Sequence, residues 1–95
     1  MKNIPSITDF VPVITVNTLK LRLKERFRLR RKEQKIAQLM LAQRSGVSYA
    51  SIRRFESTGE ISLHSLLSIC QAIGLLEELD GLFKQPIIKN LKDFK

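Results

Sequence analysis

The sequence has one cysteine, no tryptophan and no long hydrophobic run. A lone thiol, Cys70, excludes an intrachain disulfide and any metal site built from several cysteines, and it fits a reducing compartment. No segment approaches the roughly 18 apolar residues of a membrane span. The stretch "FVPVITV" is too broken, and too far from a small-residue cleavage site, to be a signal peptide. We therefore expect a cytoplasmic protein without a membrane partner.

Motifs of enzyme chemistry are also missing. The only histidine, His64, has no second histidine with which to form a metal site or a catalytic pair. The sequence contains no Gly-x-Ser-x-Gly elbow, no glycine loop for phosphate and no paired carboxylates in a plausible cleft. We expect no catalytic residues, no metal and no cofactor.

Acidic residues are scarce in one half of the chain. Lysine and arginine number 17 against nine acids overall, and the segment 20–54 holds twelve basic and two acidic residues. From residue 55 onward, four lysines face six acids. Charge gathered in one segment is typical of a protein that lies on the phosphates of a nucleic acid.

A chain of 95 residues suits one domain with a modest core. Residues 1–17, with two prolines and many β-branched side chains, are predicted to form an extended N-terminal arm. Thr18 is predicted to cap the first of five helices, and residues 18–83 to form an all-α domain followed by a tail, 84–95. In the tail, apolar side chains at Ile87, Ile88, Leu91 and Phe94 follow one stripe.

Apolar spacing predicts the core of this domain. Leu19, Leu23 and Phe27 share one face of the first helix, while Leu21 and Leu29 lie on another, where they serve either peripheral packing or a partner surface. The remaining residues predicted to face inward are Leu39, Leu41, Ala42, Val47, Ile52, Phe55, Leu63, Leu66, Leu67, Ile69, Cys70 and Ile73.

The middle of the chain predicts two short helices joined by a tight turn. Ala42 and Gly46, four residues apart, supply the small contact and the positive φ angle that a steep crossing needs. Ser48 is predicted to cap the next helix, which runs to Ser57. Because the apolar side of this helix packs on the rest of the domain, its opposite face presents Tyr49, Ala50, Arg53 and Arg54.

The segment "KIAQLMLAQRSGVSYASIRRFE" resembles the helix-turn-helix of the phage-repressor and Cro-like (XRE-type) family, and the resemblance extends from about residue 18 to 83. Positions shared with that family are Ile36, Gln38, Leu41, Ala42, Gly46, Val47, Ser48, Ile52 and Glu56. The chain departs from the family pattern at Arg30, Lys35, Ala37 and Ser45. Of these, Ala37 replaces the usual capping Ser or Thr, and Lys35 replaces a glycine, so the first turn is expected to be shaped differently.

The resemblance implies a five-helix lambda-repressor-like domain whose recognition helix, 48–57, lies in the major groove of double-stranded DNA. It implies base contacts from Tyr49 and Ala50, early in the recognition helix, and from Arg53 later in it. It also implies a phosphate contact from Gln38. It also implies a structural pair, Arg31 with Glu56. The full predicted set of DNA-binding residues is Gln38, Ser48, Tyr49, Ala50, Ser51, Arg53 and Arg54.

The expected function is a repressor that binds a palindromic operator as a homodimer, because one recognition helix covers only a few base pairs. Three surfaces are candidates for the dimer contact: the fifth helix, the "FVPVITV" arm and the face of Leu21 and Leu29. An alternative is an antitoxin that neutralises a HipA-like kinase toxin, since the ending "SLLSICQAIGLLEELDGLF" resembles that of small regulators paired with such toxins. RNA binding is disfavoured, because the aromatic side chains that stack on single strands are largely missing.

Overall fold

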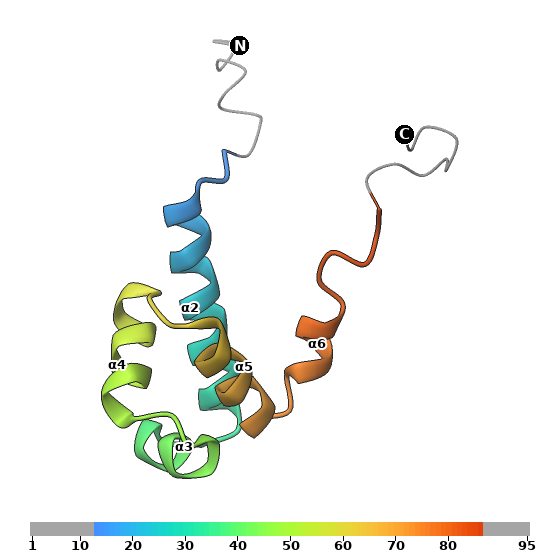
Figure 1. Cartoon of the computed structure of the whole chain (residues 1–95). Helices are drawn as coiled ribbons and strands as arrows, with labels where there is room; N and C mark the ends of the chain where they lie inside the picture. Colours follow the sequence, from blue (N-terminus) through green and yellow to red (C-terminus); the bar gives the residue numbers. More distant parts are fainter. Residues whose placement is uncertain (1–12, 87–95) are drawn as a thin grey trace.

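A computed structural model describes residues 13–86 of the chain as an all-α fold without strands in that range. Its five helices are connected by short turns (Figure 1). Their bounds are α2 Val16–Glu33, α3 Gln38–Ser45, α4 Tyr49–Thr58, α5 Leu63–Ala72 and α6 Leu76–Asp80. The apolar stripe predicted in the tail and most of the predicted arm lie outside the described residues.

The first helix begins earlier than predicted. Thr15, and not Thr18, is the N-cap: its hydroxyl accepts a hydrogen bond from the Thr18 backbone N–H at 3.0 Å. In return the Thr18 hydroxyl accepts from the Thr15 N–H at 2.9 Å. This is a capping box in which a threonine takes the place of the usual Glu or Gln at the third helical position. Val16 and Asn17, assigned to the arm by sequence, are therefore helical.

The two helices of the central motif are joined as the sequence predicts. Gly46 ends α3 with φ of 79°, and its N–H donates to the Ala42 carbonyl at 3.0 Å. Ser48 then caps α4, accepting from the Ser51 N–H at 3.0 Å. At the preceding turn, Lys35 adopts a positive φ of 58° although it carries a Cβ. The lysine thus keeps the left-handed conformation that glycine adopts more easily.

The core lies where α2, α3, α4 and α5 meet. Phe27 of α2 and Phe55 of α4 pack edge to face with ring centroids 5.6 Å apart, a favourable aromatic geometry. Leu41, Ile52 and Ile69 have no solvent exposure. The other buried apolar residues are Ile36, Val47, Cys70, Ile73 and Leu75.

Several residues predicted to face inward are exposed instead. Leu19 and Leu23 are 39% and 45% exposed, because no other helix covers that side of α2. Leu39 and Leu63 lie in the first turns of α3 and α5, at the edge of the core, and Leu67 is also exposed. Periodicity thus identified the apolar residues, but it did not indicate that one side of α2 lacks a covering helix.

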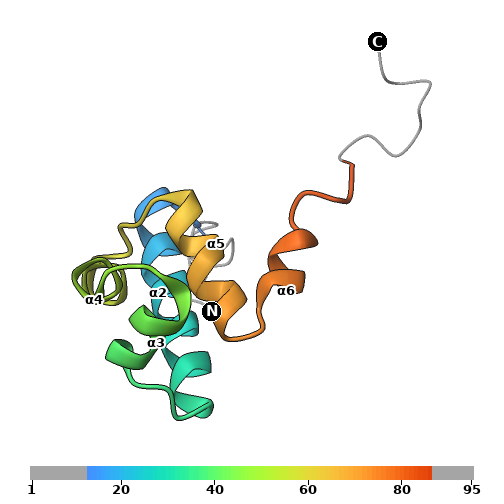
Figure 2. The ribbon, with the colours of Figure 1, turned by 60° about the horizontal axis from the view of Figure 1, so that its bottom comes forward.

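The helices form a compact body with one helix set apart. α2 packs against α4, and α3 packs against both α4 and α5. In both ribbon views α4 and α6 lie on opposite sides, with α2 and α5 between them (Figure 1, Figure 2). α6 makes its helix contact with α5. Within residues 13–86, none of these helices has the length and apolar character that crossing a membrane requires.

Candidate nucleic-acid interface

α4 buries one side and exposes a charged one. Ile52 and Phe55 hold it on the body at 0% and 3% exposure. The side chains of Ala50, Arg53 and Arg54 are exposed on the rest of its surface. Neither of these two arginines forms a salt bridge within residues 13–86. The helix is therefore anchored by its apolar side while two guanidinium groups remain available to an external anion.

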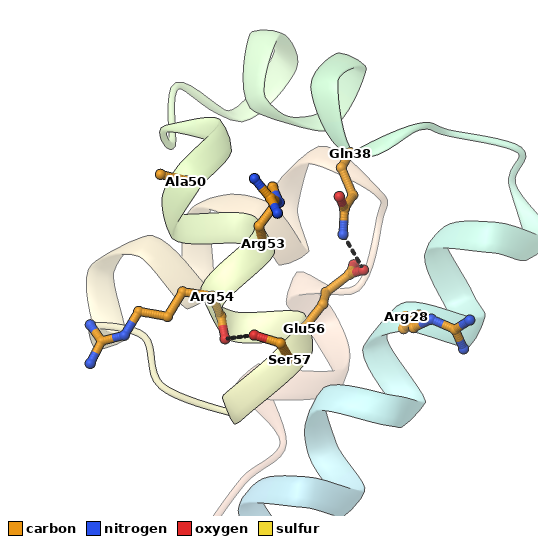
Figure 3. A pocket seen from close by; sticks show the side chains of 7 residues that line it. All are labelled: Arg28, Gln38, Ala50, Arg53, Arg54, Glu56 and Ser57. Atoms are coloured by element: carbon orange, nitrogen blue, oxygen red, sulfur yellow. Dashed lines mark hydrogen bonds between the residues drawn. The ribbon is translucent and has the colours of Figure 1, made fainter.

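The two arginines of α4 point in different directions. The Arg53 guanidinium carbon lies 5.5 Å from the centre of the Tyr49 ring, within the range of a cation–π contact. Figure 3 shows Arg53 extending toward Gln38, whereas Arg54 extends away on the other side of α4. Tyr49 and Arg53, four residues apart, thus form one surface of the helix, and Arg54 belongs to its flank.

Ser48 and Ser51 take part in a local network at the start of α4. The Ser48 hydroxyl accepts from the Ser51 backbone N–H and donates to the Ser51 hydroxyl at 2.8 Å. The Ser48 side chain is therefore engaged in capping, a role that stabilises a helix by about 0.5–2 kcal/mol. Ser48 is exposed and directly precedes Tyr49 at the start of α4.

A buried ion pair ties α2 to the end of α4. Arg31 donates from Nε and Nη2 to the two Glu56 carboxylate oxygens, both at 2.7 Å, and from Nη1 to the Ile36 carbonyl at 2.8 Å. The Gln38 amide adds a third hydrogen bond to Glu56 at 2.8 Å (Figure 3). Arg31 and Glu56 are each 7% exposed, so the network joins three helices from within the domain.

Gln38 thereby has a role that sequence reasoning did not include. One of its amide hydrogens holds Glu56, and the second remains for another acceptor. Ala37, the N-cap of α3, provides no side-chain hydrogen bond, so the first N–H groups of α3 are not capped by its side chain. Uncapped N–H groups and a helix N-terminus favour an anion such as a phosphate oxygen.

A hollow of about 520 Å³ opens between α2, α3 and α4. It contains Arg28 and Ser57, two residues that were not predicted. Both are polar side chains visible in the sequence, but only the packing of α2 against α4 brings Arg28 to this hollow. The residues that line the hollow are Arg28, Gln38, Ala50, Arg53, Arg54, Glu56 and Ser57 (Figure 3).

The hollow is electropositive. Its one carboxylate, Glu56, is neutralised by Arg31 behind it. Arg28 stands across the hollow on α2, where it is half-buried and pairs with Glu25 at 3.1 Å. Three arginines therefore line the hollow, of which Arg53 extends toward Gln38 and Arg54 away from it, and this excess of positive charge suits a polyanion.

The remaining chemically reactive side chains lie elsewhere. Cys70 is buried in the core, and its burial, followed by the charge of Glu78, raises the pKa of its thiol to about 11. A thiol held protonated in this way is a poor nucleophile. His64 is exposed on α5. Within residues 13–86, no group of three or more His, Cys, Asp or Glu side chains is arranged to hold a metal ion.

Comparison with known proteins matches one family. The family model HTH_3, described as helix-turn-helix, covers residues 27–79, which span the hollow and most of the core. A comparison with curated proteins and one with solved structures each found no match. The fold, the turn at Gly46 and the exposed face of α4 agree with this match. The chain therefore belongs to the phage-repressor and Cro-like (XRE-type) helix-turn-helix family of DNA-binding transcriptional regulators.

Proposed function

We propose that this chain is a repressor that reads a two-fold symmetric operator as a homodimer, with α4 in the major groove. The observation that supports this most is the exposed face of α4, whose arginines form no salt bridge within residues 13–86. The other face of α4 is held on the body by Ile52 and Phe55. An α-helix fits the width of the major groove of B-DNA.

Base reading is assigned to the surface formed by Tyr49 and Arg53. A guanidinium can donate two hydrogen bonds to the O6 and N7 atoms of guanine, and the Tyr49 ring beside it restricts its motion. The Ala50 methyl group is suited to pack on a thymine methyl group. Arg54, Ser48 and Ser51 flank this surface.

Phosphate contacts are assigned to the rim of the hollow. Gln38 has one amide hydrogen left beside the N-terminus of α3, where an anion is favoured. Arg28 faces the same hollow from α2 and is suited to a second phosphate. The Arg31–Glu56 pair makes no base contact in this scheme; it holds Gln38 and α4 in register.

The test distinguishes a contact with a base from a contact with a phosphate. Arg53→Ala is expected to cost about 1–3 kcal/mol on the cognate operator and to relax the preference at one base pair. Gln38→Ala is expected to weaken binding to operator and scrambled duplex by similar factors, because phosphates are the same in every sequence. Binding titrations of each variant on both duplexes measure this difference.

The matched control is Arg22→Ala, which removes an exposed positive charge outside the hollow. We expect it to leave sequence preference unchanged. If Arg53→Ala lowered both affinities equally and left the preferred sequence intact, Arg53 would be a phosphate contact and the assignment of the reading surface would be wrong.

The second candidate is an antitoxin that binds a HipA-like kinase and regulates its own operon. It is favoured by the segment "SLLSICQAIGLLEELDGLF", residues 65–83, and by the separation of α6 from the rest of the body (Figure 1). Co-expression with a HipA-like kinase encoded beside this chain tests it. A complex that survives gel filtration and abolishes kinase activity supports it, and separate elution of the two proteins at micromolar concentration contradicts it.

A further inference from the structure

A second hollow, of about 960 Å³, is lined mainly by α2, α5, α6 and the residues just after α6. Its surface is mostly apolar, and we call it the α6 groove. Several of its apolar side chains are exposed to solvent: Leu19, Leu23, Leu29, Leu63, Leu82 and Phe83. An exposed apolar surface of this extent on a small protein marks a place where something binds.

The described part of the chain ends at the rim of this groove. Leu82 and Phe83 line the groove directly after α6, and the described residues stop three positions later, at Pro86. Phe83 is 97% exposed, and contact of a whole phenyl ring with water is unfavourable. In Figure 1 this stretch runs from α6 toward the end of the molecule at which α2 begins. The residues that follow Pro86 therefore start beside the exposed apolar side chains of the groove.

The nine residues after Pro86, "IIKNLKDFK", have the sequence of an amphipathic helix. At about 100° per residue, the apolar side chains cover roughly 120° of a helix, and Lys89 and Lys92 fall outside that stripe. A helix this short is marginal in water unless its apolar side packs on another surface. The stripe consists of Ile87, Ile88, Leu91 and Phe94.

We propose that residues 87–95 fold back as a helix into the α6 groove of their own chain, with Leu91 against Leu23. The lengths agree: at about 1.5 Å per residue, a helix over residues 87–95 is about 13.5 Å long, and α2 between Leu19 and Leu29 is about 15 Å long. The stripe thus meets the exposed leucines of α2, and its lysines remain in water. The proposal is independent of the proposed function.

The short connection favours this segment over a second copy or another protein as the occupant. Only residues 84–86 lie between Phe83 and the stripe. A segment held by a short linker reaches an effective concentration of the order of millimolar, so a weak apolar contact is already occupied within one chain. α4 lies across α2 and α5 from α6 in both views, and its exposed face stays open (Figure 1, Figure 2). Another protein can use the groove only after it displaces the tail.

A disulfide cross-link within one chain tests the proposal. In a Cys70→Ala background, Leu23→Cys is combined with Leu91→Cys and the full chain is oxidised in dilute solution. We expect an intrachain disulfide, seen as a monomer whose thiols no longer react with iodoacetamide. The control combines Leu91→Cys with Leu39→Cys, at an exposed residue of α3 outside the groove, and we expect its thiols to stay reactive. Circular dichroism checks that each variant is folded.

Amide hydrogen exchange of the full chain, with Cys70 in place, is an independent measurement. The Leu82 N–H donates to the Leu79 carbonyl at 3.0 Å, and this bond opens more often when nothing holds α6 on the body. Leu91→Asp places a charge in the stripe and is expected to speed exchange at Leu82 about tenfold or more. Lys92→Asp, one residue further and outside the stripe, is expected to leave it unchanged. Exchange at the buried Ile52 should change in neither variant.

Three results would overturn the proposal. A disulfide that forms only between two chains assigns the groove to a second copy. A disulfide of Leu23→Cys with Val11→Cys, but not with Leu91→Cys, assigns it to the N-terminal residues. Exchange at Leu82 that is equal in the parent and in Leu91→Asp shows that the tail does not hold α6. In the proposed arrangement, the exchange rates of the parent are the same at low and high protein concentration, because the contact lies within one chain.

Discussion

At the scale of single residues, Glu56 connects the core to the proposed DNA-binding surface. It accepts two hydrogen bonds from Arg31 and one from Gln38. Removal of one member of a buried pair leaves the other charge without compensation, whereas replacement of both members by apolar groups is often nearly neutral. The pair is therefore better understood as a positioning device than as a source of net stability.

Glu56→Leu is expected to lower the free energy of unfolding by about 3–5 kcal/mol, because Arg31 is then buried without its carboxylate. The double variant Arg31→Met with Glu56→Leu is expected to recover most of this loss. Urea denaturation of the three proteins measures both effects. Equal destabilisation by the single and double variants would contradict the proposed origin of the loss.

Lys35 carries backbone strain that a glycine would relieve. Its φ of 58° lies in the left-handed region, which costs a residue with a Cβ about 1–2 kcal/mol. Lys35→Gly is therefore expected to raise the free energy of unfolding by about 0.5–1 kcal/mol, after the greater freedom of glycine in the unfolded chain is counted. Lys32→Gly, within α2, is the control, and we expect it to destabilise. Thermal denaturation of each variant measures these opposite changes in stability.

At the scale of elements, the start of α2 depends on its cap. Thr15 and Thr18 satisfy each other's backbone N–H groups, and this reciprocal arrangement places the N-cap three residues before the predicted one. The added turn begins with Val16, whose side chain is 80% exposed. Helix length here thus determines how much apolar surface α2 exposes.

Thr15→Ala is expected to destabilise the protein by about 0.5–2 kcal/mol and to fray the first turn of α2. Amide hydrogen exchange should show faster exchange at Thr18 and Leu19 but not at Phe27, which is buried. Thr58→Ala, at the last position of α4, serves as the control outside any N-cap. Unchanged exchange at Thr18 would contradict the capping role of Thr15.

At the scale of the whole molecule, charge and apolar surface are divided between two sides. The hollow with Arg28, Arg53 and Arg54 lies on one side of α2, and a mostly apolar hollow lined by Leu19, Leu23 and Leu29 lies on another. α2 thus contributes side chains to both hollows.

Binding to DNA is expected to depend steeply on salt. The logarithm of the association constant should fall with the logarithm of salt concentration by about 0.9 per phosphate contacted. Arg28→Ala is expected to reduce that slope by about one, whereas Arg22→Ala leaves it unchanged. Titrations from dilute to physiological salt measure the slopes, and a flat response of the parent would contradict binding through the basic segment.

Sequence alone determined the helical class, the turn at Gly46, the Ser48 cap and the family, because these depend on local spacing and on residues a few positions apart. The exposed face of α4 was predictable for the same reason, since burial of Ile52 and Phe55 leaves the opposite side outside.

Only the tertiary structure decided which apolar residues are covered and which side chains share a site. Leu23 and Phe27 have the same helical spacing, yet only Phe27 meets another helix. The entry of Arg28 into the hollow and the hydrogen bond from Gln38 to Glu56 depend on how α2, α3 and α4 cross. Such contacts join residues far apart in the chain, and helical periodicity carries no information about them.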